Sequence, residues 1–202
     1  SAGRAPLAMA PRDGLALANH TGFSAAGAAL ALAAAGRAHD AACAAAALIM
    51  EGFRANLTPL DPRALSAKPL PGQARAAAAL TTLLEGSGLW EPGAARRLQD
   101  PLSLRNAAQI HGGVAAALAA AREIVEIELN GSSDNPVALI ESGEMISCGA
   151  YHTTELALAV EGVGRAWVHL TMMQVARISK MMDPRFTDLP LFLARPGSAS
   201  NG

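Results

Sequence analysis

The chain has 202 residues, of which 51% are hydrophobic, 16% are charged and 3% are aromatic. This composition excludes a disordered chain, which has few apolar and many charged residues. The 16 Lys and Arg residues against 17 Asp and Glu residues give a net charge of -1, so the sequence carries no basic footprint for nucleic acid. Alanine is the commonest residue and the strongest helix former, so the composition predicts a helical protein with enough material for a core.

The two cysteines, Cys43 and Cys148, are too few for a disulfide framework or a paired-thiol metal site. We therefore expect a reducing, cytoplasmic setting. No apolar run approaches the ~18 residues that a membrane span requires, and no signal peptide opens the chain. The sequence predicts neither a membrane nor a nucleic acid as a partner.

Residues 14–53 are almost continuously helix-forming, but Gly22, Gly27 and Gly36 lie among them. Glycine weakens a helix, so we predict two helices here with a break near Gly36. Charged residues are sparse over this stretch, whereas an amphipathic surface helix would show a polar face. The stretch therefore belongs inside a large bundle or in a subunit interface.

Four prolines lie in residues 54–72, which predicts a long loop, and loops of that length are usually functional or interfacial. A helix is predicted over roughly residues 73–86, closed by the Glu-Gly-Ser-Gly run at 85–88. After residues 98–105 another helix should run to about Leu129. No domain linker is visible in residues 1–202, so we expect one segment without an internal boundary.

Residues 130–136 are dense in turn-forming residues, and residues 137–140 and 145–147 are predicted to pair as a small β-hairpin. Thr153 or Thr154 can cap a final long helix, with Glu155 in its first turn and an end near Asp183. A stripe at helical spacing runs along it: Leu156, Val160, Val163, Trp167, Leu170 and Met173. The predicted fold class is all-α, a long-helix bundle with one small β-hairpin, apparently an incomplete part of a larger domain.

The single motifs for chemistry are weak. His152 and Glu155 could place two metal ligands on one helical face, but a third ligand at fitting spacing is missing, so an acid at a helix start beside a hydrogen-bonded histidine is favoured. The remaining histidines are scattered singly, and each is interpreted as a packing or surface residue: His20, His39, His111 and His169. We therefore expect no metal.

One segment stands out, because polar residues gather there in a chain of alanine and leucine: Gln99, Asp100, Ser103 and Arg105. An arginine in such surroundings should be paired, since an isolated buried charge is costly. Its planar fork suits a carboxylate. That carboxylate could be Asp100, within the fold, or it could belong to a substrate, and spacing favours neither.

Six segments resemble motifs of the histidine and aromatic amino acid ammonia-lyase family, in the family's order and over essentially the whole chain. Residues 11–21 (PRDGLALANHT) resemble Pro-Lys-Glu-Gly-Leu-Ala-Leu-x-Asn-Gly-Thr, and residues 71–73 resemble the end of His-Pro-Gly-Gln. Residues 98–105, with Gln109 after them, are similar to Gln-Asp-Pro-Tyr-Ser-Leu-Arg. Residues 130–136, 147–152 and 188–193 resemble Asn-Ser-Ser-Ser-Asp-Asn-Pro, Ser-Gly-Gly-Asn-Phe-His and Gly-Leu-Pro-x-Phe-Leu.

The resemblance implies an enzyme that eliminates ammonia from histidine or an aromatic amino acid to give an α,β-unsaturated acid. It implies that Asn19 contacts the electrophile and the amino-acid end of the substrate, that Arg105 binds the substrate carboxylate and that Gln99 lies close to the electrophile. Tyr151 stands where the family has a phenylalanine beside the electrophile, and Leu102 would line the same pocket. Family members are tetramers of long helices in which three subunits contribute to each active site.

The family's electrophile is 4-methylidene-imidazol-5-one (MIO), made from an Ala-Ser-Gly that this chain does not contain. MIO is therefore expected in the complete enzyme, with the missing part in another chain or lost, and the 202 residues alone should be inactive. Leu102 replaces the family's tyrosine, and His20 replaces a glycine. The sequence predicts part of an MIO-dependent ammonia-lyase or related aminomutase; the alternative is an inactive lyase-like scaffold or partner subunit.

Overall fold

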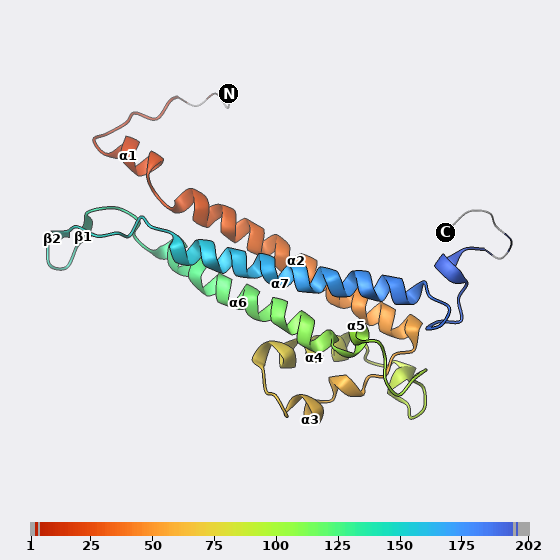
Figure 1. Cartoon of the computed structure of the whole chain (residues 1–202). Coiled ribbons are helices and arrows are strands. Elements are labelled where there is room, and N and C mark those ends of the chain that lie inside the picture. Colours follow the sequence, from red (N-terminus) through yellow and green to blue (C-terminus); the bar gives the residue numbers. More distant parts are fainter. Residues whose placement is uncertain (1–2, 4, 196, 198–202) are drawn as a thin grey trace.

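The computed structural model describes residues 3, 5–195 and 197, and three long helices dominate it (Figure 1). These are α2 (Gly22–Phe53), α6 (Ala107–Asn130) and α7 (Thr154–Met181), which run side by side as an elongated bundle. Alanine-rich sequence permits such lengths because alanine loses no side-chain entropy in a helix. The prediction of a long-helix bundle with one small hairpin is confirmed.

The predicted break near Gly36 is wrong. Helix α2 passes through Gly27 and Gly36, and the break lies earlier, between α1 (Asp13–Ala18) and Gly22. A glycine in a helix costs about 1 kcal/mol relative to alanine, which a long packed helix tolerates. At the actual break, His20 Nδ1 accepts a hydrogen bond of 2.8 Å from the Gly22 N–H.

The predicted loop at residues 54–72 contains two short helices, η1 (Thr58–Leu60) and α3 (Pro62–Leu65). Helix α4 (Pro71–Leu83) begins slightly before its predicted start, because a proline suits the first position of a helix. Helix α4 packs on α6 through two glycines: a Cβ on Gly72 would lie 2.2 Å from the Gly112 carbonyl oxygen. Two helix backbones meet there without side chains between them.

After η2 (Gly88–Trp90), the short helix α5 (Leu102–Arg105) leads into α6 across a break at Asn106. Strands β1 (Val137–Leu139) and β2 (Glu144–Ile146) pair antiparallel, as predicted. The capping prediction for α7 is wrong, because Thr153 makes no side-chain cap bond and Thr154 Oγ1 lies 2.7 Å from His152 Nδ1 instead. The described part of the chain ends with η3 (Leu191–Leu193) and the residues after it.

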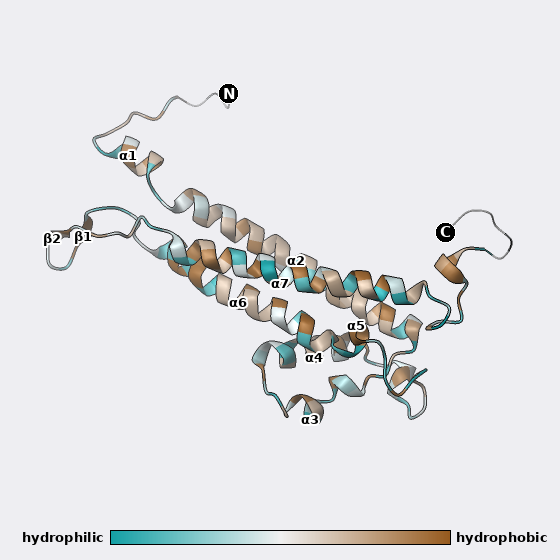
Figure 2. Ribbon diagram, viewed as in Figure 1, coloured by the Kyte–Doolittle hydropathy of each residue, from teal (hydrophilic) through white to brown (hydrophobic). Residues whose placement is uncertain are grey.

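The buried side chains form a larger core where α2, α4 and α5 meet, and smaller clusters along the bundle. The predicted stripe on α7 is present, and the structure places Leu156, Val163 and Leu170 of it in the core. Helix α2 is coloured pale to brown over most of its length in Figure 2, and some of its large apolar side chains are exposed. Phe23 on α2 is 89% exposed and Leu48 is 74% exposed.

One helical stretch, Asp13–Phe53, is long and apolar enough by length and composition to cross a membrane. The expectation that no apolar run approaches that length is therefore wrong, because many alanines together keep the stretch apolar without a run of large side chains. One such helix is weak evidence for a membrane, since the core helix of a soluble protein meets the same criterion. Several large apolar side chains of α2 are nevertheless exposed in the single chain.

Candidate functional site

The short helix α5 lies near the C-terminal end of α7 (Figure 1). It carries Leu102 and Arg105, and Gln99 precedes it. Arg105 Nη1 donates a hydrogen bond of 2.8 Å to Gln99 Oε1, and Leu102 between them is exposed. Asp100 turns away to accept the Asn56 N–H at 2.6 Å. Among the described residues no ion pair joins Asp100 to Arg105, so no protein carboxylate is in direct contact with the Arg105 guanidinium.

Asp100 fixes the backbone under this segment. Its side chain is 6% exposed, and its Oδ1 has no partner in the described chain. Burial raises the pKa of the Asp100 carboxyl, while the hydrogen bond from Asn56 and the nearby arginines act in the opposite direction. Asn56 Nδ2 also donates to the Leu98 carbonyl at 2.7 Å, so the residues before α5 are held at two points.

Asn19 and Tyr151 lie at the opposite end, with the β-hairpin, and both are exposed. An ion pair of 2.8 Å between Arg12 and Asp134 ties the segment before α1 to the loop that follows α6. In the same loop, Asn135 Oδ1 accepts the Cys148 N–H at 2.8 Å. Short polar contacts thus hold this end together.

The structure does not bring the five predicted site residues together within one chain. Helix α7 has 28 residues, which at 1.5 Å per residue makes it about 42 Å long. Tyr151 precedes its first residue, whereas Arg177 near its last turn contacts Ser103 in α5. Tyr151 and Arg105 are therefore separated by roughly 35 Å along the helix axis. Each end holds part of the predicted set.

A buried polar cluster that the sequence interpretation missed lies between the ends. His39 and Cys43 on α2 and His111 on α6 place their ligand atoms within 4.8 Å of one another. Arg177 Nη1 lies 3.3 Å from His111 Nε2. The spacing of His39 and Cys43, one helical turn apart, was a signal, but His111 and Arg177 are too distant in sequence for any spacing to connect them.

The hydrogen bonds fix where the protons of this cluster lie. The His111 carbonyl only accepts, so His39 Nε2 donates to it at 3.1 Å. Arginine only donates, so His111 Nε2 accepts from Arg177, and its proton lies on Nδ1, 3.3 Å from Cys43 Sγ. A metal ion at these three ligand atoms would have to displace protons beside a cation. The arrangement is that of a buried hydrogen-bond network.

Burial sets the titration of the cluster. It lowers the pKa of His111 to about 3, with Arg177 and His39 adding to the effect, and it lowers the pKa of His39. Burial also raises the pKa of the Cys43 thiol to about 11, which makes it a poor nucleophile. Around neutral pH the two histidines and the thiol are uncharged.

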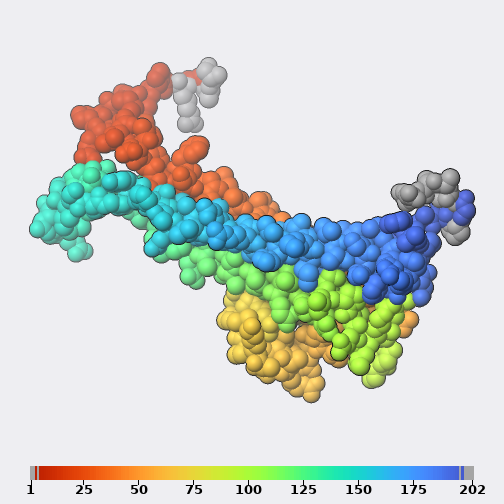
Figure 3. Space-filling view, viewed as in Figure 1, coloured from red at the N-terminus to blue at the C-terminus, as the bar shows by residue number. Residues whose placement is uncertain are grey.

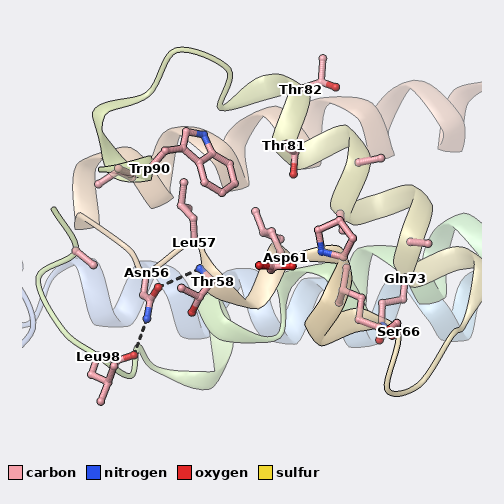
Figure 4. Close-up of a pocket in the computed structure, with 18 of the residues that line it drawn as sticks. Asn56, Leu57, Thr58, Asp61, Ser66, Gln73, Thr81, Thr82, Trp90 and Leu98 are labelled. Atoms are coloured by element: carbon pink, nitrogen blue, oxygen red, sulfur yellow. Dashed lines mark hydrogen bonds between the residues drawn. The ribbon is translucent and has the colours of Figure 1, made fainter. Parts of the chain in front are cut away.

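A separate hollow of about 1250 Å³ lies between η1, α3, α4 and the segment after η2 (Figure 4). Leu57, Trp90 and Thr81 are among the residues that line it. None of the five predicted site residues belongs to its wall. The space-filling view shows this lobe, in yellow and light green, beneath the long body of the bundle (Figure 3). The hollow therefore borders the start of the segment that carries Arg105, through Leu98, but does not include Arg105 itself.

A family model for aromatic amino acid lyases matches residues 1–202, the whole chain. The chain belongs to the aromatic amino acid lyase family. Histidine ammonia-lyase from Anaeromyxobacter dehalogenans is 36% identical over 205 residues, covering 100% of this chain and 40% of that enzyme. The chain thus spans about 40% of the length of the curated lyases that it matches. The family resemblance of the sequence motifs is confirmed.

Solved structures of the family share the fold. Ergothionase from Treponema denticola superposes with a TM-score of 0.87 and 30% identity, over 94% of this chain and 38% of that one. Histidine ammonia-lyase from Trypanosoma cruzi gives a TM-score of 0.85 and 29% identity, over 98% of this chain and 37% of that one. Tyrosine aminomutase from Streptomyces globisporus gives a TM-score of 0.86 and 28% identity, over 95% of this chain and 41% of that one.

Proposed function

We propose that this chain is the central part of an MIO-dependent ammonia-lyase that eliminates ammonia from histidine or an aromatic amino acid to give an α,β-unsaturated acid. The observation that carries the proposal is the Arg105 guanidinium, which is held by Gln99 at 2.8 Å and has no protein carboxylate as partner. The Nε and Nη2 groups of this guanidinium face no protein carboxylate and can bind a substrate carboxylate through two parallel hydrogen bonds. Arg105 thus fixes the substrate's carboxylate.

The residues assigned to the surroundings of MIO fit a carbonyl-bearing group. Asn19 is an exposed amide at the α1–α2 break, and Gln99 uses its oxygen for Arg105, which leaves its amide N–H groups free to donate. When bound, MIO supplies the electrophile that makes the amino group a leaving group. This chain binds and orients the substrate: Arg105 holds the carboxylate, Asn19 the amino-acid end, and Tyr151 and Leu102 flank the side chain.

Because the two sets of predicted residues lie far apart in one chain, a site that contains both sets must draw on more than one copy. We propose a homotetramer in which neighbouring copies run antiparallel, so that the Asn19 and Tyr151 end of one copy meets the Arg105 end of another.

Partner copies would also cover the apolar outer faces, because contiguous exposed apolar surface marks an interface. Helices α2 and α7 carry many exposed apolar side chains, including Phe23, Leu30, Leu48, Met172 and Val175. On this proposal the protein is cytoplasmic, with a small amino acid as its ligand and neither membrane nor nucleic acid as a partner. The part that carries the MIO precursor lies outside these 202 residues, in a second chain or in a further part of the protein, so we expect the 202 residues alone to be inactive.

Two alternatives stay in view. An aminomutase would use the same residues, and tyrosine aminomutase from Streptomyces globisporus shares the fold. A catalytically inactive lyase-like scaffold is favoured by Leu102, which places an exposed apolar side chain where the family has a tyrosine hydroxyl. Product analysis separates all three, since a β-amino acid, an unsaturated acid or nothing would form.

The activity test uses the complete protein with L-histidine, L-phenylalanine and L-tyrosine, and follows the absorbance of the unsaturated acid. We expect product with one of them, and we expect Arg105→Lys to lower kcat/KM by about 10- to 100-fold with an unchanged melting temperature, since one charge-assisted bond is worth roughly 1.5–3 kcal/mol. An Arg105→Lys enzyme that melts earlier but keeps its kcat/KM would make Arg105 a structural residue.

A mixing experiment tests the shared site. Tyr151→Ala and Arg105→Lys each damage one half-site, so each pure variant should be nearly inactive. If the halves come from different copies, unfolding and refolding the two variants together regenerates some intact sites and a fraction of the activity. If the mixture shows no more activity than the average of the two variants, each site is built from one copy.

A further inference from the structure

Arg177 is the largest fully buried side chain of the described chain, with 1% of its surface exposed. Its described partners are neutral: the Ser103 carbonyl accepts from Nε, and His111 Nε2 accepts from Nη1. Its Nη2 has no partner among the described residues. A buried guanidinium without a carboxylate is costly, and an apolar side chain of similar volume would stabilise a bundle better. Stability of the core alone does not account for Arg177.

The contact with Ser103 lies at a break in the helix. Helix α5 ends at Arg105 and α6 begins at Ala107, and Asn106 between them has φ -97° and ψ 21°, outside the helical range. A helix that ends leaves the carbonyls of its last turn without their usual N–H donors. Arg177 reaches across from α7 and supplies a donor for one of them, the buried Ser103 carbonyl.

Ser103 and Arg105 belong to the same four-residue helix, so the direction of α5 determines where the Arg105 guanidinium points. On the inner side, Arg177 holds the Ser103 carbonyl. Before the first residue of α5, Asp100 Oδ2 accepts a hydrogen bond of 2.6 Å from the Asn56 N–H. With both anchors in place, Arg105 meets Gln99 at 2.8 Å.

We propose that Arg177 is a positioning residue for Arg105: by holding the Ser103 carbonyl it maintains the α5–α6 break and thereby the orientation in which Arg105 receives a carboxylate. This inference rests on the proposed role of Arg105. Arg177 is itself fixed, since His111 accepts from it and in turn contacts Cys43 at 3.3 Å and, through its carbonyl, His39 at 3.1 Å. Three helices thus hold one guanidinium in one orientation.

The experiment measures how strongly the complete protein prefers a carboxylate to an amide. The probes are cinnamate and urocanate, each compared with its own carboxamide, and the readout is the ratio of the two dissociation constants from calorimetry. The ratio refers only to folded protein, so a partly unfolded preparation does not change it. We expect Arg105→Lys to lower the preference about 10- to 100-fold and Arg177→Lys about 3- to 10-fold, because lysine keeps the charge but not the fixed fork.

The double variant decides whether the two arginines act through one another. If Arg177 works through Arg105, Arg177→Lys has little further effect on the preference once Arg105 is lysine; additive effects would make the two residues independent and overturn the inference. Trp167→Phe, on the same helix, is the control: it removes another buried N–H without a described partner and should leave the ratio unchanged.

Two further outcomes are decisive. An unchanged ratio in Arg177→Lys, together with a reduced ratio in Arg105→Lys, refutes the positioning role and leaves the proposed function intact. An unchanged ratio in Arg105→Lys refutes the carboxylate role on which both rest. Should Arg177→Lys not fold, His111→Met removes the acceptor of Nη1 and should lower the preference about 2- to 5-fold; an unchanged ratio there refutes the inference as well.

Discussion

The two ends of the bundle are stabilised in different ways. At the α5 end, Arg105 is supported by Asp100 and Arg177, both buried, and by the larger of the apolar cores. At the hairpin end, Asn19 and Tyr151 are exposed, and the contacts around them, such as Arg12 with Asp134, lie at the surface. The half that we propose to bind the carboxylate is thus held by buried groups of the same chain, whereas the other half is held by contacts at the surface.

The largest loss of stability is expected from a substitution in the close contact of α4 with α6, which lies at the α5 end of the bundle. In Gly112→Ala the new Cβ would lie 2.6 Å from the Gln73 backbone nitrogen, and backbone cannot rotate away. We expect a loss of about 3 kcal/mol or more in unfolding free energy, measured by urea titration. Gly113→Ala is the matched control: its Cβ meets nothing within 4 Å, and alanine should stabilise the helix by up to ~1 kcal/mol. Equal effects of the two substitutions would contradict the close packing.

The buried histidine near the α5 end should also make the stability of the protein depend on pH. His111 has its pKa lowered to about 3 in the folded protein and titrates near 6.5 when unfolded, so the unfolded state gains the proton first. Stability that is present above pH 6.5 is therefore lost as the pH falls towards 3, by about 2 kcal/mol between pH 7.5 and 5 from this histidine. Urea titrations over that range should show the decline. His111→Leu should flatten it, and a variant with the full wild-type slope would place the loss elsewhere.

The smallest effect is expected at the hairpin end. Both partners of the Arg12–Asp134 ion pair are about half exposed, at 51% and 53%, and exposed pairs contribute little. Arg12→Gln should lower the unfolding free energy by no more than ~0.5 kcal/mol in low salt, and by less in 1 M NaCl, where the charges are screened. A loss above ~1 kcal/mol that persists in 1 M NaCl would show that this end is as firmly built as the other.

The sequence predicted those features that depend on residues close together along the chain. The α7 stripe and the β-hairpin follow from the periodicity of adjacent residues, and both are present. The break at Gly36 was wrong because glycine propensity is weak beside the packing of a long helix. Arg105 and Gln99 were found together because they lie in one short segment. The network of Cys43, His111 and Arg177 was not predicted, because its members come from three helices and the first two are 68 residues apart.

The hydrogen bond between His20 and Gly22 has a consequence for engineering. A Cβ at residue 22 would lie 2.6 Å from His20 Nδ1, so any other side chain there would push the imidazole aside and break the bond. The two residues therefore form one transferable unit. Grafting His20 alone into a relative with a bulkier neighbour would give a freely rotating imidazole. Replacing His20 would leave the Gly22 N–H without its acceptor. The long helix would then begin with a poor helix former, glycine, and an uncapped N–H.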